Sequence, residues 1–193
     1  MKSILFKSNM VKAIAEGRKT QTRRLDGLKE ISQETDRWSQ GKIIERGCFV
    51  FNLENTLRLK FVKPRYQVGD VVYITEAWAD LWQSKRDIGD IAYKLDLPAD
   101  VAVAKWRSPR FMPKRAARYF IKITDVRCER LQEITEEDAI DEGAIVMHSE
   151  DIDEESGYSF RLGFMDLWDS VNPKYPWASN PWVWRFEFEK AEK

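Results

Sequence analysis

The pattern of hydrophobic and polar positions predicts a domain built mainly of short strands. Hydrophobic residues alternate with polar ones along residues 117–130 and along residues 182–188, which is typical of strands with one buried face. Residues 71–74 are β-branched or aromatic and follow turn-forming residues, so they predict a third strand. Shorter apolar runs predict strands at residues 3–6 and 91–95, and a hairpin within residues 43–62 that turns at Glu54 and Asn55.

Helical spacing of hydrophobic residues marks three further segments. Residues 8–16 have this spacing, with Ser8 or Asn9 as the expected cap and Gly17 at the end. The other two are residues 135–143, which open with a capping hydroxyl and acidic side chains, and residues 160–171, which end before a proline. Because these helices do not alternate regularly with the strands, the sequence predicts an α+β fold that is mixed or barrel-like.

Length and composition suit one domain, residues 1–193, with elaborations. A hydrophobic content of 43% in 193 residues is enough for a core. We interpret residues 25–65 as an insertion, because residues 25–40 are polar and show no core face. No N-terminal apolar run is as long as a signal peptide or a membrane span, so we expect a cytoplasmic protein without membrane contact.

Cysteine and histidine usage argues against a soft-metal site. Without clustered spacing or a secretion signal, we expect Cys48 and Cys128 to be reduced thiols. His148 is the single histidine, so zinc is not expected, and the sequence predicts no cofactor. Magnesium, which prefers carboxylate oxygens, stays open. The sequence carries no prediction of the oligomeric state.

The charges are segregated although the net charge is zero. Residues 1–24 carry seven cations against Glu16 alone, and residues 105–118 carry six cations and no acid. Residues 129–155, in contrast, carry twelve acids against a single arginine. If the two basic stretches share a face, they form a positive groove on a neutral body, which suits a polyanion or a nucleotide.

The first basic stretch contains the candidate active or ligand-binding segment, residues 17–24, with four cations and two hydroxyls directly behind the first helix. In an extended strand, Lys19 and Arg23 would point to one side and Thr22 and Arg24 to the other. A functional pairing of Lys19 with Thr22 therefore requires a turn or bulge between them. The alternative is that these cations lie in water at the negative end of the helix.

The second basic stretch includes a loop, residues 106–115, in which aromatic side chains alternate with cations. Such a loop could stack bases and bind phosphates, or its prolines could hold Trp106 and Phe111 in the core. Glu76, at the end of the third strand, is a further candidate carboxylate, because strand ends often carry function.

Taken together, these blocks resemble the ASCH domain family, a branch of the PUA-like folds. The pattern Gly17-x-Lys19-x-x-Thr22-x-Arg24 is similar to the most specific motif of that family. Residues 66–72 look like its aromatic-x-x-Gly-Asp strand entry, residues 135–143 like its acidic helix and residues 183–188 like its closing strand. The resemblance covers about half of the chain. The chain departs from the family's minimal enzyme by the insertion at residues 25–65, the basic loop around Arg110 and an elaboration at residues 144–180, so its overall pattern looks closer to ASCH proteins of phages and prophages. It implies a compact, small β-barrel with flanking helices and inserted hairpin and loops, and an affinity for RNA or modified nucleosides.

In the branch of this family that hydrolyses N(4)-acetylcytidine, a lysine, a threonine and a glutamate act together. The matching positions here are Lys19, Thr22 and Glu142, although the last could slip to Asp141 or Asp138. The resemblance therefore implies an amidohydrolase in which Thr22 is the nucleophile and Lys19 is the general base. Glu142 would either transfer protons or hydrogen-bond the edge of the nucleobase. The expected contacts to the nucleoside or RNA are Arg18, Arg23, Arg24, Glu76, Trp78, Trp106, Arg107, Arg110, Phe111, Lys114 and Arg115.

Two other functions stay open at this point. The same cations could hold phosphates while an aromatic side chain stacks a base, which would make the protein a binding module without chemistry. A ribonuclease is the third possibility, with Lys19 stabilising the charge on the phosphoryl group. A fold alone does not choose among them.

Overall fold

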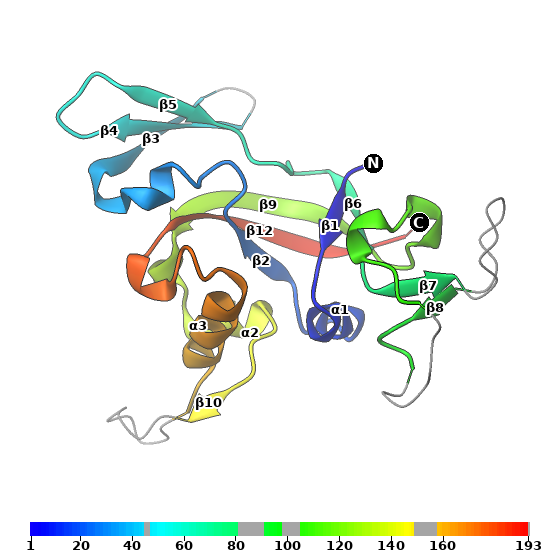
Figure 1. The fold of residues 1–193 in the computed structure, drawn as a ribbon. Helices are drawn as coiled ribbons and strands as arrows, with labels where there is room; N and C mark the ends of the chain where they lie inside the picture. The colour runs from blue at the N-terminus through cyan, green and yellow to red at the C-terminus, as the bar shows by residue number, and fades with distance from the viewer. Residues whose placement is uncertain (45–46, 81–90, 98–104, 149–157, 193) are drawn as a thin grey trace.

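The computed structural model describes residues 1–44, 47–80, 91–97, 105–148 and 158–192 (Figure 1). Its main sheet has five strands in the spatial order β1 (Ser3–Leu5), β6 (Val71–Thr75), β9 (Phe120–Arg130), β12 (Trp182–Ala191) and β2 (Gln21–Arg24). Strands β1 and β6 run parallel, and the other neighbours run antiparallel. The prediction that the strands around Val71, Ile121 and Val183 share one sheet is confirmed.

The two edge strands of this sheet, β1 and β2, do not pair with each other. In the described part of the chain the sheet therefore does not close into a barrel. A side chain spans the gap instead, because the Arg24 guanidinium on β2 donates a hydrogen bond of 2.8 Å from Nη2 to the Leu5 carbonyl on β1. The predicted α+β class is confirmed in this coarser form, with strands predominating over helices.

The three helices of the described residues match the predicted segments: α1 (Ser8–Ala15), α2 (Glu136–Asp141) and α3 (Phe160–Val171). Helix α1 begins after Lys7, which makes no side-chain capping bond, so the expected cap at Ser8 or Asn9 is wrong. Helix α2 has the predicted cap, since the Thr135 hydroxyl accepts a hydrogen bond from the Asp138 amide at 3.1 Å. Figure 1 shows α2 and α3 side by side.

The predicted hairpin is part of a second, three-stranded antiparallel sheet of β3 (Trp38–Ile44), β4 (Cys48–Leu53) and β5 (Leu59–Val62). Asn55 has a positive φ of 59° in the turn between β4 and β5, where the sequence predicts a turn.

The expectation that residues 25–40 have no core face is wrong. Leu28 and Ile31 are fully buried in the same cluster as Trp38 and the main sheet.

The remaining elements are short. They are the strand pairs β7 (Trp78–Asp80) with β8 (Ile91–Tyr93) and β10 (Met147–His148) with β11 (Tyr158–Ser159), and the 3₁₀ turns η1 (Ile31–Gln33), η2 (Thr35–Arg37), η3 (Pro109–Phe111), η4 (Lys114–Ala116), η5 (Leu131–Glu133) and η6 (Trp177–Ser179). Most of the acidic loop expected at residues 148–156 lies outside the described residues. No described helix combines the length and the apolar character that a bilayer crossing requires.

Strand β12 lies between two hydrophobic clusters, because its side chains alternate in direction. Trp184 and Phe186 face the larger cluster, which the second sheet and helix α1 share. Val183 faces a smaller cluster that includes Phe164 and Trp168 of helix α3. Both cysteines are free thiols, with Cys128 buried in the larger cluster. This arrangement places α2 and α3 against the sheet face next to β2.

Candidate active site

Lys19 lies in the short connection between α1 and β2. The amides of Arg18 and Lys19 both donate to the Ala13 carbonyl, at 2.8 and 3.2 Å, which turns the chain sharply after the helix. Gly17 has a φ of 79°, a conformation that glycine adopts without strain. Because β2 begins only at Gln21, Lys19 precedes the strand. The turn at Glu16 and Gly17 comes before Lys19 and not between Lys19 and Thr22, so the described chain does not show the turn that a direct pairing of these two side chains requires.

The ammonium group of Lys19 makes three hydrogen bonds with nearby oxygens. It donates to Oε2 of Glu142 at 2.6 Å, to the Glu142 carbonyl at 2.7 Å and to the Gln21 carbonyl at 2.8 Å. The two side chains are 1% and 4% exposed, so this ion pair is shielded from water. Burial lowers the pKa of Lys19, and the Glu142 carboxylate opposes that shift.

The carboxylate that meets Lys19 is thus Glu142 and neither of the two alternatives on α2. The Asp138 carboxylate accepts a hydrogen bond from Gln21 at 3.0 Å, and Asp141 offers its carbonyl to the Thr20 amide at 2.8 Å. Glu142 is the C-cap of α2, and Gly143 after it has a φ of 75°. The acidic helix therefore ends directly at the lysine.

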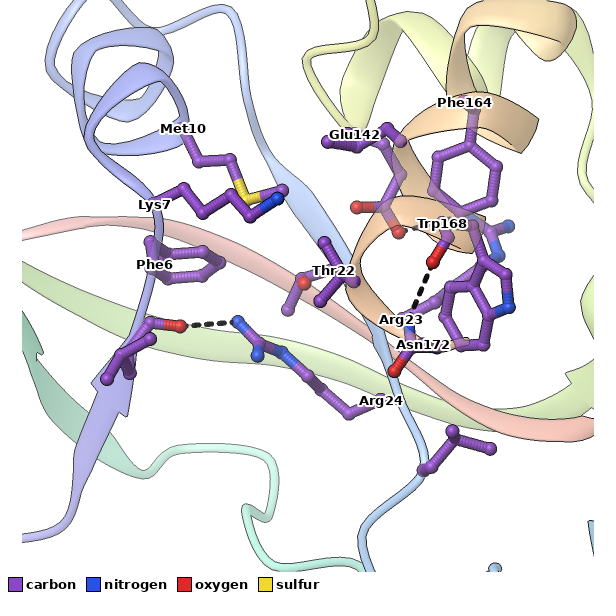
Figure 2. Close-up of a pocket in the computed structure, with 14 residues that line it drawn as sticks. Phe6, Lys7, Met10, Thr22, Arg23, Arg24, Glu142, Phe164, Trp168 and Asn172 are labelled. Carbon is purple, nitrogen blue, oxygen red and sulfur yellow. Dashed lines mark hydrogen bonds and ion pairs between the residues drawn. The ribbon is translucent and has the colours of Figure 1, made fainter. Parts of the chain in front are cut away.

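A pocket of about 100 Å³ opens beside this pair, between β1, α1, β2 and α3 (Figure 2). Thr22, Arg24 and Glu142 contribute polar groups to it, and Figure 2 shows Thr22 and Glu142 directed toward the same space. Thr22 is 4% exposed, so its hydroxyl is available only to a molecule that enters the pocket. Lys19 does not line the pocket but lies behind Glu142.

The remaining pocket wall is mostly apolar and comes from residues that motif reasoning missed. The lining side chains of this kind include Phe6, Met10, Phe164, Leu167 and Trp168. Helical spacing predicts a buried face on α3, but it does not predict that this face lies opposite β2. An apolar wall that includes aromatic rings, beside a few polar groups, suits a small molecule with an apolar body and a polar edge.

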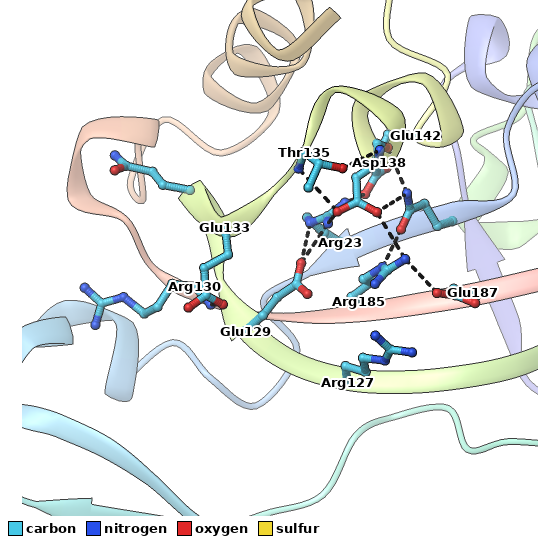
Figure 3. A network of polar contacts seen from close by, with 12 residues as sticks. Arg23, Arg127, Glu129, Arg130, Glu133, Thr135, Asp138, Glu142, Arg185 and Glu187 are labelled. Carbon is cyan, nitrogen blue, oxygen red and sulfur yellow. Dashed lines mark hydrogen bonds and ion pairs between the residues drawn. The ribbon is translucent and has the colours of Figure 1, made fainter.

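Arg23 points to the other side of β2 and joins a buried network of carboxylates (Figure 3). Its guanidinium contacts Glu129 at 2.7 Å, Asp138 at 3.0 Å and Glu142 at 3.3 Å, and its side chain is 0% exposed. Burial raises the pKa of Glu129, and the charge of Arg23 opposes that shift. Arg23 was expected to contact nucleic acid; in this structure three protein carboxylates surround its guanidinium, and the residue also lines the pocket. Its contact with Oε1 of Glu142 helps to fix the orientation of that carboxylate.

Arg24 differs from Arg23 because no carboxylate of the described residues forms a salt bridge with it. Its guanidinium stacks on the Phe6 ring at 4.9 Å, and Nη2 donates to the Leu5 carbonyl. The Nε atom is buried and has no hydrogen-bond partner within the described chain. Burial lowers the pKa of Arg24, which means that the protein alone solvates its charge poorly. This Nε–H is a donor without an acceptor at the edge of the pocket.

Several candidates lie away from the pocket. Arg18 is exposed and donates from Nε to the Glu16 carboxylate at 2.9 Å. Glu76 is buried, but Arg118 occupies both of its oxygens, at 2.8 and 2.9 Å. Trp78 is buried in a separate cluster with Met112. These three side chains serve structure in this arrangement.

The basic loop contributes less to the site than the sequence suggests. Arg107 stacks on Trp78 at 5.1 Å, Trp106 is half-buried, and Lys114 and Arg115 are exposed. Phe111 is 76% exposed, and Met112 fills the core in its place, so the alternative in which Phe111 plugs the core is wrong. Arg110 of this loop lines a second pocket, which shares Arg24 with the first.

No group of three or more histidine, cysteine, aspartate or glutamate side chains in the described chain is arranged to hold a metal ion. Comparison of the sequence with protein-family models and with curated proteins, and of the fold with solved structures, found no match. The geometry around Lys19, Thr22 and Glu142 is therefore the main indication of a function for this chain.

Proposed function

We propose that the chain is an ASCH-like protein of the PUA-like group and that its pocket hydrolyses an acyl-amide on a modified pyrimidine nucleoside such as N(4)-acetylcytidine. The observation that carries this proposal is the meeting of three residues from distant parts of the chain. Lys19 contacts Glu142 at 2.6 Å, and Glu142 shares a pocket with Thr22. A hydroxyl, an amine and a carboxylate in one place supply what acyl transfer needs.

In the proposed reaction, Thr22 Oγ1 attacks the carbonyl carbon of the acyl group. Its proton passes to the Lys19–Glu142 pair, and the Arg24 guanidinium, which lines the pocket, stabilises the negative charge on the carbonyl oxygen. The C–N bond then breaks, and the pair returns the proton to the exocyclic nitrogen, which releases the nucleoside. Water hydrolyses the remaining ester on Thr22, which yields the carboxylic acid and regenerates the hydroxyl.

The Lys19–Glu142 pair suits proton transfer because burial makes the charged form of the lysine less favourable than it is in water. Burial lowers the pKa of Lys19 from its ordinary value, and the Glu142 carboxylate opposes that shift. The Glu142 carboxylate lines the pocket and connects the lysine behind it to the substrate. Arg23 holds the other carboxylate oxygen at 3.3 Å, which fixes the orientation of Glu142.

The size of the pocket limits what part of a substrate enters it. A volume of about 100 Å³ holds the acylated edge of a pyrimidine but not a whole nucleoside, since pockets for complete small molecules span about 300–1,000 Å³. Phe6 and Trp168 offer apolar surface to that edge. The ribose would then point outward along the gap between β1 and β2.

The test is incubation of the purified protein with N(4)-acetylcytidine, followed by measurement of cytidine release. Thr22→Val removes the hydroxyl at nearly constant shape and is expected to lower the rate by about a hundredfold or more, whereas Thr22→Ser keeps the nucleophile. Arg127→Gln, on the exposed part of β9, is the control and should leave the rate unchanged. A wild-type protein that releases no cytidine contradicts the proposal.

One observation favours a second candidate, a binding module for a modified base. All three ammonium hydrogens of Lys19 already have protein acceptors, an arrangement that is also typical of a structural lysine. In that case the wild type and Thr22→Val would bind N(4)-acetylcytidine with similar affinity, and neither would turn it over.

A further inference from the structure

A second pocket lies next to the first, on the other side of Arg24. It has a volume of about 350 Å³ and is lined along one side by residues 3–5 of strand β1. The two pockets share Leu5 and Arg24, whose hydrogen bond therefore lies on their common boundary. Both pockets follow the gap between the unpaired edge strands β1 and β2.

Positive charge dominates the lining of this second pocket. Arg24, Arg65 and Arg110 face it together with one carboxylate, Asp26, so the lining carries an excess of two positive charges. Tyr66 adds the edge of a buried ring, over which Arg65 stacks at 5.5 Å. Arginine presents several N–H groups in a planar fork, which suits the oxygens of a phosphate.

The three arginines of this pocket are also unusual because no acidic side chain among the described residues pairs with them. Among the described residues, nine of the eleven other arginines lie within 4.0 Å of a carboxylate oxygen. None of Arg24, Arg65 and Arg110 forms such a pair with a described residue. Burial and the nearby charge of Arg65 both lower the pKa of Arg24, so an anion in the pocket would stabilise its charge.

We propose that this second pocket binds the phosphate of a ribonucleotide, so that the protein prefers a phosphorylated nucleoside to the free nucleoside as its substrate. This inference rests on the proposed function, which places the acylated base edge in the first pocket. The ribose then passes Arg24 and Leu5, and its phosphate reaches Arg65 and Arg110. A phosphate monoester carries a charge of about −1.5 to −2 at neutral pH, which matches the excess of two positive charges. The volume lies within the range of about 300–1,000 Å³ that small-molecule sites occupy.

The test compares the binding of cytidine, of cytidine 5′-monophosphate and cytidine 3′-monophosphate, and of a short RNA oligonucleotide without a terminal phosphate, by isothermal titration calorimetry at low salt. The wild type is expected to bind one of the two monophosphates about tenfold to a hundredfold more tightly than cytidine, as charge-assisted hydrogen bonds predict. The double variant R65Q/R110Q should lose this preference. Arg127→Gln, which removes one exposed arginine elsewhere, should retain it.

Three results would overturn the inference. Equal affinity for cytidine and both monophosphates would show that the protein has no phosphate site. If R65Q/R110Q still binds a monophosphate more tightly than cytidine, the phosphate site is not in this pocket. Tighter binding of the oligonucleotide than of either monophosphate would assign the pocket to a phosphodiester of RNA instead of a monoester. Arg65 and Arg110 are exposed, so the double variant should fold normally, and its thermal unfolding provides that check.

Measurements of binding and of turnover show separately whether the phosphate site exists and whether the hydrolysis occurs. If no acetylated substrate is hydrolysed but the arginine-dependent preference for a monophosphate is present, the phosphate site stands and the proposed hydrolysis fails. If N(4)-acetylcytidine and its monophosphates are hydrolysed with equal kcat/KM in the wild type and in R65Q/R110Q, the hydrolysis stands and the phosphate site fails.

Discussion

Lys19 and Glu142, which are 123 residues apart in the chain, are joined by two hydrogen bonds from one ammonium group. One bond goes to the carboxylate at 2.6 Å and the other to the main-chain carbonyl of the same residue at 2.7 Å. The second bond satisfies a carbonyl at the end of α2 that has no partner within the helix, and the positive charge lies at the negative end of that helix. The same lysine thus positions the carboxylate and stabilises the helix that carries it.

This pair should show strong energetic coupling. Lys19→Met leaves the Glu142 carboxylate buried with Arg23 as its remaining partner and should lower the free energy of unfolding by about 3–5 kcal/mol. Adding Glu142→Gln removes the uncompensated charge, so the double variant should be less destabilised than the sum of the two single variants. Urea unfolding of all four proteins measures this coupling. Strict additivity would mean that the two side chains do not stabilise each other.

Gly143 should matter for the site as well as for the backbone. An alanine there would keep a φ of 75°, and its Cβ would lie 3.3 Å from Cβ of Lys19. We expect Gly143→Ala to cost about 1–2 kcal/mol from the backbone conformation alone and also to reduce turnover or ligand affinity by displacing Lys19. Gly69→Ala is the matched control, since its φ is 88° and no atom lies within 4 Å of the added Cβ. It should lose similar stability in urea unfolding and keep full function.

Gly163 sets the position of the aromatic pocket wall. A Cβ at this position would lie 1.7 Å from the Ile145 carbonyl oxygen, a distance that no rotamer change can relieve. Gly163→Ala must therefore move α3, and we expect a loss of about 3 kcal/mol or more in the free energy of unfolding. Ser170→Ala, on the exposed side of the same helix, should change thermal stability little. Equal melting temperatures for the two variants would contradict the close approach of α3 to Ile145.

The stability contributed by Asp138 should depend on pH. Burial alone would raise the pKa of Asp138, but the hydrogen bond from Gln21 and the charges of Arg23 and Arg185 outweigh it, so the pKa lies below its usual value. A carboxyl with a lowered folded-state pKa stabilises the protein above its unfolded pKa of about 3.9, and this contribution is lost as the pH falls through the folded pKa.

Asp138→Asn should therefore be less stable than the wild type by about 1.5–3 kcal/mol at neutral pH, and the two should converge in acid. Urea unfolding across pH 2–7 tests this, with the exposed Asp166→Asn as a control that should match the wild type throughout. A stability difference that persists at pH 2 would show that the carboxylate charge is not its source.

Periodicity predicts most of the secondary structure because it reports which side of an element is buried. The strands at residues 71–75 and 120–130 and helix α3 end close to where the hydrophobic pattern places them. The burial of Leu28 and Ile31 cannot be predicted in this way. They lie in turns, where hydrophobic residues do not recur at a regular spacing, and they are buried against a sheet that other segments form.

The candidate site is predictable only in part for a related reason. The spacing of Lys19 and Thr22 is local, so a motif can identify both. The carboxylates that neutralise Arg23 lie 106 to 119 residues away along the chain, and a basic run gives no sign of them. Arg24 and Arg110 line the same pocket only because the tertiary structure brings them together, so the sequence gives no sign of this either.

The pairing of β2 with the C-terminal strand β12 affects the order in which the protein folds. Within the described sheet, β2 forms its backbone ladder with β12, whose residues come more than 150 positions later. Contacts of such high sequence separation form slowly, because a long loop must close before they contribute. During synthesis on the ribosome, the segment with Lys19 and Thr22 emerges first but lacks its strand partner until residues 182–191 follow. The pocket is therefore among the last parts of the protein to form, and a chain that ended before β12 would contain these side chains without the strand pairing that holds them.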